Sequence, residues 1–96
     1  MNIGISIRKI RKERTPQLNQ AEFAKHIGLT QTYLSQIENG KKTPTIAVLE
    51  KIAKSFEIPL PIIFWYGIEI SDIHDSKKEY FEFLKPTIDS MIDAVI

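Results

Sequence analysis

Two helix signals separated by one glycine place the tightest restriction on how this chain folds. Asn19, with Glu22 three residues later, has the spacing of a capping box, so a helix is expected to begin there. That helix is expected to end at Gly28, because glycine readily adopts the left-handed conformation that closes a helix. Thr30 is a favourable N-cap for the next helix. The sequence therefore predicts two short helices joined by a tight turn.

The helix after Thr30 separates its apolar residues from its polar ones. At 100° per residue, Leu34 and Ile37 fall opposite a polar face that is about 140° wide. Tyr33 lies at the boundary between the two. The polar face carries neutral hydrogen-bonding side chains instead of the usual Lys and Glu: Gln31, Thr32, Ser35, Gln36 and Asn39. Amides and hydroxyls of this kind can meet the paired donors and acceptors that base edges offer in the major groove of DNA.

Hydrophobic spacing predicts helices through the rest of the chain, and no segment alternates as a strand does. We expect a helix over residues 3–14, and an all-α fold. A further helix is expected in the last twenty residues, with Pro86 kinking or dividing it.

The spacing of Gln20, Ala24, Gly28, Leu34 and Ile37, together with the stretch LSQIENGKKTPT, resembles the helix-turn-helix unit of the Cro/phage-repressor (XRE) family. The resemblance covers roughly residues 5–64. It implies a lambda-repressor-like bundle of five helices, to which this chain adds a C-terminal helical extension. The fourth helix of that bundle is expected over residues 45–56 and the fifth over residues 59–66. The fourth is expected to turn five residues inward: Ile46, Leu49, Ile52, Ala53 and Phe56. We expect residues 1–67 to form the DNA-binding domain and residues 68–96 the extension.

The resemblance also assigns roles to particular residues. Base reading is expected from Gln31, Thr32, Ser35 and Gln36. Contacts with the DNA backbone are expected from Gln20, Tyr33, Asn39, Lys41, Lys42 and Thr43, although Tyr33 is equally suited to covering the edge of the core. Arg11 and Glu38 match a pair that ties the first helix to the recognition helix, which is a structural role.

The charge is unevenly divided between the two halves. Residues 1–56 hold ten Lys or Arg and four Glu, whereas residues 57–96 hold three Lys and eight Asp or Glu. A basic half of this kind suits a polyanion such as double-stranded DNA, although a small protein can also show such a split by chance.

An apolar stripe in the acidic half is expected to support self-association. With the preceding aromatic segment, the expected dimerisation residues are Phe64, Trp65, Phe81, Leu84, Ile88, Met91, Ile92 and Val95. The alternative is that the stripe folds back on its own domain. About thirty residues are too few for a sensory domain, so no small-molecule effector is expected.

Catalytic and metal-binding patterns are not expected in this chain. It has no cysteine and two distant histidines, so no metal site, cofactor or enzyme activity is expected. The longest apolar run is too short for a bilayer span, and a cytoplasmic location is expected. The leading hypothesis is a sequence-specific transcriptional regulator, in particular a repressor, that binds an inverted repeat as a homodimer. The alternative is an antitoxin-like regulator whose C-terminal half binds a partner protein.

Overall fold

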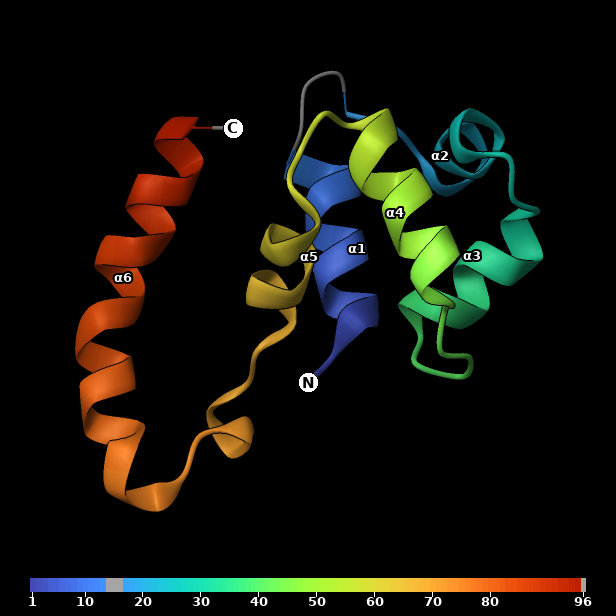
Figure 1. Cartoon of the computed structure of the whole chain (residues 1–96). Coiled ribbons are helices and arrows are strands. Elements are labelled where there is room, and N and C mark those ends of the chain that lie inside the picture. The colour runs from blue at the N-terminus through green and yellow to red at the C-terminus, as the bar shows by residue number, and fades with distance from the viewer. Residues whose placement is uncertain (14–16, 96) are drawn as a thin grey trace.

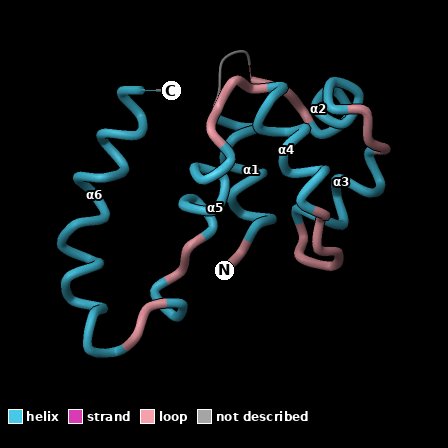
Figure 2. The backbone as a smooth tube through the Cα atoms, in the orientation of Figure 1, coloured by secondary structure: helices cyan, strands magenta, loops and turns pink. Residues whose placement is uncertain are grey.

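Six α-helices and two short 3₁₀ turns make up the described chain. The computed structural model describes residues 1–13 and 17–95, apart from the side chain of Val95. The helices are α1 (Ile3–Glu13), α2 (Gln20–Ile27), α3 (Gln31–Glu38), α4 (Ile46–Ser55), α5 (Leu60–Gly67) and α6 (Lys78–Val95) (Figure 1). Two 3₁₀ turns, η1 (Ile70–Asp72) and η2 (Asp75–Lys77), precede α6. Figure 2 shows helices and loops throughout these residues and no strand, so the all-α prediction is confirmed.

Helices α1 to α5 form a bundle around one hydrophobic core. Its buried members are Ile7, Ile10, Phe23, Ala24, Ile27, Leu34, Ile37, Leu49, Ile52, Ala53, Ile58 and Ile63. Local signals decide where three of these helices begin. The side chains of Asn19, Thr30 and Thr45 each accept a hydrogen bond from a backbone N–H in the first turn that follows.

Helix α1 crosses the bundle and contacts both α3 and α5. A Cβ on Gly4 would lie 2.5 Å from the carbonyl oxygen of Ile37, so only glycine lets α1 approach the end of α3 this closely. On the other side, the Ser6 hydroxyl donates to the carbonyl of Ile63 at 2.5 Å, and Asn2 N–H donates to Gly67 at 2.7 Å. These contacts hold α1 between the helix-turn-helix unit and α5.

The prediction that Ile46 faces inward is wrong. Its side chain is 55% exposed, whereas Leu49, Ile52 and Ala53 of the same face are buried. Ile46 is the first residue of α4. Ile46 also lies about 60° around the helix from Leu49 and so at the edge of the apolar face, which leaves it exposed while Leu49 is covered.

Helix α6 lies outside the bundle, beside α5 and on the opposite side of the molecule from α3 (Figure 1). It runs as one helix through Pro86. Proline cannot donate to the carbonyl of Glu82, four residues earlier, but both residues are exposed, so water can satisfy that carbonyl. The expected division at Pro86 therefore does not occur. None of the described helices combines the length and the apolar character needed to cross a membrane.

Candidate nucleic-acid interface

The connection between α2 and α3 has the geometry of a helix-turn-helix. Gly28 closes α2 in the left-handed conformation, with φ 73° and ψ 29°. The next residue is hydrogen-bonded to α2, because Leu29 N–H donates to the carbonyl of Ala24 at 2.8 Å. Thr30 then starts α3 by accepting from Tyr33 N–H at 3.1 Å. The capping box at Asn19 is also complete, as the sequence predicted.

Helix α3 turns its apolar side to the core and its polar side outward. Leu34 and Ile37 are almost completely buried. Gln31 and Thr32 are exposed, while Ser35 and Gln36 are half-buried. The four predicted base-reading residues therefore share the outer face of one short helix. Tyr33 is half-buried and packs against the core, which supports the covering role for its ring.

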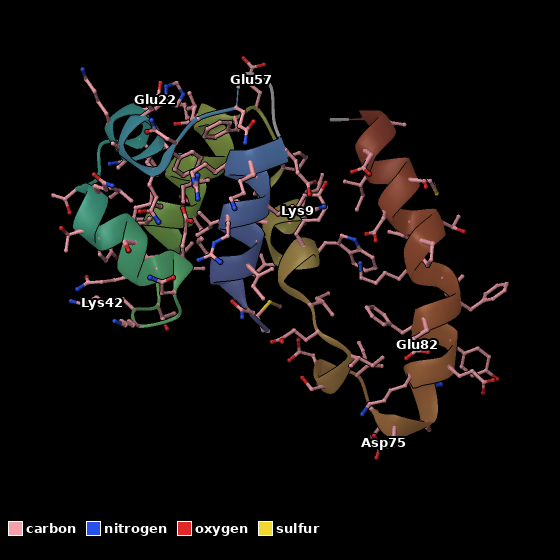
Figure 3. The ribbon with its side chains drawn as sticks, turned by 180° about the vertical axis from the view of Figure 1, so that it is seen from behind. Lys9, Glu22, Lys42, Glu57, Asp75 and Glu82 are labelled. Atoms are coloured by element: carbon pink, nitrogen blue, oxygen red, sulfur yellow. The ribbon has the colours of Figure 1, made fainter. Side chains whose placement is uncertain are left out.

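The predicted backbone-contacting residues flank this face. Asn39, Lys41, Lys42 and Thr43 are all exposed in the loop after α3. That loop is tied to the helix, because Lys41 N–H and Lys42 N–H both donate to the carbonyl of Gln36, at 2.8 and 3.2 Å. Lys42 projects from the side of the molecule opposite α6, on which the acidic residue Glu82 lies (Figure 3).

Gln20 is the first residue of α2 and lies next to the end of α3. Its side-chain amide donates to Glu38 Oε1 at 3.4 Å, so Gln20 is half-buried between α2 and the end of α3. The roles of Gln20 and of the flanking loop in binding phosphate stay predictions.

The carboxylate of Glu38 is the centre of a buried polar network. Arg11 donates to both of its oxygens at 2.9 Å, which confirms the expected pair. The Glu38 side chain is fully buried, so this two-pronged contact compensates a charge that would otherwise be costly in the interior. Arg11 also donates to the carbonyl of Leu18 at 3.3 Å and so holds the chain that leads into α2.

Arg8 belongs to the same network and was missed by the sequence reasoning. Its Nε donates to Glu38 Oε1 at 3.4 Å, and its Nη2 donates to Asn39 Oδ1 at 3.0 Å. A signal was present, since Arg8 lies three residues before Arg11 and therefore on the same side of α1. Only the crossing of α1 over the end of α3 shows what that side faces.

The predicted dimerisation residues divide into two groups. Phe64 packs against the bundle core, and Trp65 and Phe81 contact each other with ring centroids 5.9 Å apart. Ile88 and Ile92 are half-buried, whereas Leu84 and Met91 are exposed. The side chain of Val95 lies outside the described residues. Part of the stripe therefore packs against α5, in agreement with the alternative expectation that it folds back on its own domain.

The remaining apolar residues of α6 face away from the bundle. Phe83 is 80% exposed, Tyr80 68%, Met91 64% and Leu84 50%. These four residues fall within about 100° of the helix surface; we call them the outer face of α6. Phe83 was not among the predicted dimerisation residues, although its spacing of three from Tyr80 places it on the same side of the helix.

Polar contacts complete the junction between α5 and α6. The indole N–H of Trp65 donates to Asp89 Oδ1 at 2.7 Å, and the Tyr66 hydroxyl donates to Asp93 Oδ1 at 3.2 Å. Burial, together with the nearby Asp93 carboxylate, raises the pKa of Tyr66 to about 12. The two aromatic residues of α5 that have a polar group, Trp65 and Tyr66, thus hold α6 through hydrogen bonds.

Comparison with known proteins agrees with this geometry. The helix-turn-helix family model matches residues 7–63. Control protein C.MunI of a Mycoplasma species is 42% identical over 64 residues, covering 67% of this chain and 85% of that protein. The ImmF control region 10 kDa protein of Bacillus phage phi105 is 37% identical over 68 residues, covering 71% of this chain and 73% of the phage protein.

A longer relative is the HTH-type transcriptional repressor RghR of Bacillus subtilis, 30% identical over 80 residues, which cover 82% of this chain and 58% of RghR. No solved structure matches the chain. The match of the family model extends from α1 into α5 and includes the capped α2–turn–α3 unit. This chain belongs to the helix-turn-helix family, of the Cro/phage-repressor (XRE) type.

Proposed function

We propose that this protein is a DNA-binding transcriptional regulator that inserts α3 into the major groove and represses transcription from its operator. The observation that carries the proposal is the outward face of α3, where Gln31, Thr32, Ser35 and Gln36 lie together on a helix of eight residues. The major groove of B-DNA is wide enough for one α-helix. Membership of a helix-turn-helix family supports the choice of α3, the second helix of the unit, as the element that enters it.

Neutral side chains on that face suit discrimination between bases. A glutamine amide can pair with N6 and N7 of adenine, and a threonine can donate to a base or touch a thymine methyl group. Gln31 and Thr32 are exposed at the start of α3, the end from which helices of this class contact base edges. We assign base reading to these two residues together with Ser35 and Gln36.

Phosphate binding falls to groups on either side of α3. Lys41, Lys42 and Thr43 are exposed in the loop that follows the helix. Gln20 opens α2, and the positive end of a helix dipole at such a start favours an anion. Asn39 ends α3 and extends the same line of polar groups. These contacts would set the position of the protein on the duplex, and the lysines would supply the salt-dependent part of the affinity.

The outer face of α6 is proposed to bind a second copy of this chain. The accessible surface is 6300 Å², whereas a compact protein of this mass exposes roughly 5,700 Å². The excess of about 600 Å² approaches the 800 Å² or so that one partner buries in a typical stable interface. The radius of gyration of 13.9 Å also exceeds the value of about 12.5 Å expected for a compact chain of this length.

The position of α6 suits such a pairing. Because α6 lies on the opposite side of the molecule from α3, two copies joined through α6 leave both recognition helices uncovered (Figure 1). In this proposal residues 1–67 bind DNA and residues 68–96 hold the dimer together. A two-fold dimer would bind an operator that is an inverted repeat. Repression, as opposed to activation, is supported by the name of RghR, a transcriptional repressor.

Selection of bound duplexes from a random pool tests the proposal. We expect the wild-type protein to enrich an inverted repeat, and the Gln31→Ala, Gln36→Ala double variant to enrich a more degenerate one or none. Gln17→Ala, an exposed glutamine outside the interface, serves as the control and should enrich the wild-type sequence. If no sequence were enriched by the wild-type protein, sequence-specific binding would be wrong. Recovery of a stable heteromeric complex in place of a homodimer would favour the antitoxin-like alternative.

A further inference from the structure

Arg8 links the first helix to the C-terminal end of α3. Its Nη2 donates to Asn39 Oδ1 at 3.0 Å, and its Nε donates to Glu38 Oε1 at 3.4 Å. The Arg8 side chain is 41% exposed, in contrast to 11% for Arg11. Arg11 is therefore the structural partner of Glu38, while Arg8 lies at the rim of the network where protein meets solvent.

The charges of this network do not cancel. The single carboxylate of Glu38 is already bound by the two-pronged contact with Arg11. Arg8 adds a second guanidinium to the same carboxylate, which leaves one excess positive charge at the end of α3. The Arg8 guanidinium is therefore available to bind a second partner, the side-chain oxygen of Asn39.

The contact with Arg8 determines which way the Asn39 amide faces. A guanidinium carries only donors, so it must meet the oxygen of the amide and not its NH₂ group. The Asn39 NH₂ group is then directed away from Arg8, where it donates to Ser35 Oγ at 3.4 Å. Asn39 is exposed, so the second N–H of this group is left for a ligand. Without Arg8, the amide could rotate and present its oxygen, which repels an anion.

We propose that Arg8 is a positioning residue for DNA binding: it holds the Asn39 amide so that its NH₂ group donates to a backbone phosphate. The inference rests on the proposed function, because it assigns Asn39 a phosphate within that complex. Ser35 is affected in turn. Since its oxygen accepts from Asn39, its hydroxyl proton is free to donate outward, which favours base acceptors such as guanine O6 and N7 or thymine O4.

A double-mutant cycle tests the coupling between the two residues. Arg8→Ala and Asn39→Ala should each weaken binding to the selected operator by about tenfold, the loss expected for one hydrogen bond to a charged group. If Arg8 acts through Asn39, the double variant should lose little more than either single variant. Losses that multiply to about a hundredfold would overturn the positioning role, because Arg8 would then act on DNA by itself.

Lys12→Ala provides the matched control for loss of charge. Lys12 is exposed and lies one turn further along the same side of α1. Any loss caused by Lys12→Ala should multiply with that of Asn39→Ala, because the two residues share no contact. Coupling as strong as that of Arg8 would mean that the effect of Arg8 is one of general charge, which would overturn the proposal.

Asn39→Asp provides a second test that leaves Arg8 in place. An aspartate can still accept from Arg8 but has no donor for a phosphate, so binding should fall by more than in Asn39→Ala. Binding equal to wild type would overturn the proposal even if Arg8→Ala failed to fold. A wild-type protein that binds no duplex would overturn the proposed function and this inference together. Specific wild-type binding with uncoupled variants would overturn this inference alone.

Discussion

Trp65 and Asp89 join the bundle to α6. The indole Nε1–H donates to Asp89 Oδ1 at 2.7 Å, and the other carboxylate oxygen accepts from Lys85 Nζ at 2.6 Å. The indole ring also contacts Phe81 of α6, with the ring planes at 54°. Trp65 is the one tryptophan of the chain, so its fluorescence reports directly on the contact between α5 and α6.

We predict that acid weakens this contact through Asp89. Burial acts to raise the pKa of Asp89, but the hydrogen bonds from Lys85 and Trp65 outweigh it and hold the pKa below the ordinary value of 3.8. Because the folded-state pKa is lowered, the stabilisation is present above about pH 4 and is lost as the pH falls through the lower folded value. The Trp65 emission should therefore change in an acid titration below about pH 4.

Asp89→Asn serves as the comparison for this titration. An asparagine keeps an acceptor for Trp65 but does not titrate, so the acid transition should disappear or move. Asp93→Asn, which removes the neighbouring carboxylate that accepts from Tyr66, should leave the transition in place. An unchanged transition in Asp89→Asn would show that another group is responsible.

The sequence was sufficient for the helix-turn-helix because its signals are local. The capping side chains of Asn19 and Thr30 and the left-handed Gly28 each act within a few residues, and all three occur as predicted. The arrangement of α6 depends on contacts across more than twenty residues, such as the one between Trp65 and Asp89. Helical periodicity identified the apolar stripe of α6, but it could not decide which part of a broad apolar surface turns toward α5.

The difference between local signals and long-range contacts also explains why the contact between Arg8 and Asn39 was not predicted. The Arg11–Glu38 pair was expected from resemblance, but the contact of Arg8 with Asn39 depends on how closely α1 crosses α3. Gly4 permits that crossing. A glycine within a predicted helix does not indicate which other helix will pack against it. Ile46 satisfied the periodicity of a core residue, and only the position of the end of α4 relative to the core shows that it is exposed.

Base discrimination should depend on the glutamines of α3. Gln31→Ala or Gln36→Ala should cost roughly 1–3 kcal/mol of discrimination at one or two base pairs, the value of a bidentate contact with a base. Affinities for a set of operators that each carry one base change would measure this. The Gln17→Ala control should retain the full pattern. A variant that discriminated all single-base changes as wild type does would have lost no base contact.

Lys41→Ala and Lys42→Ala should weaken all duplexes alike. Each lysine that contacts a phosphate contributes about 0.9 to the slope of log affinity against log salt concentration, so the slope should become shallower by about that amount. Lys77→Ala removes an equal charge from η2 beside α6, and its slope should match wild type. If all three variants had the same slope as wild type, Lys41 and Lys42 would not contact phosphate.

Loss of Arg11 should destabilise the fold severely. Among residues 1–13 and 17–95, its removal leaves the buried carboxylate of Glu38 with the longer contacts from Arg8 and Gln20, both at 3.4 Å. Breaking a buried ion pair lowers the free energy of unfolding by about 3–5 kcal/mol. Because these two contacts remain, we expect Arg11→Ala to lower it by about 3 kcal/mol. Urea unfolding measures it. Lys78→Ala breaks the exposed pair with Asp75 and should cost less than about 0.5 kcal/mol.

Charges placed on the outer face of α6 should separate the dimer without unfolding the bundle. Leu84 and Met91 are exposed on that face, so the Leu84→Glu, Met91→Glu variant should keep its helix content and thermal transition. Its light-scattering mass should fall to that of one chain of 11.1 kDa. Lys54→Glu changes the net charge by the same amount at an exposed site on α4 of the bundle, and this control should remain dimeric.

Operator binding then shows whether the dimer is the functional form. Two recognition helices related by a two-fold axis enter major grooves on the same side of the duplex when their separation is about 34 Å or a multiple of it, so the half-site centres should be a whole number of helical turns apart. The monomeric variant should bind one half-site with the affinity of the wild-type protein. It should lose the cooperative gain on the full operator, because no second subunit is held beside the second half-site at a high effective concentration. If wild-type protein at tens of micromolar were monomeric and bound an isolated half-site with full affinity, α6 would have no part in operator binding.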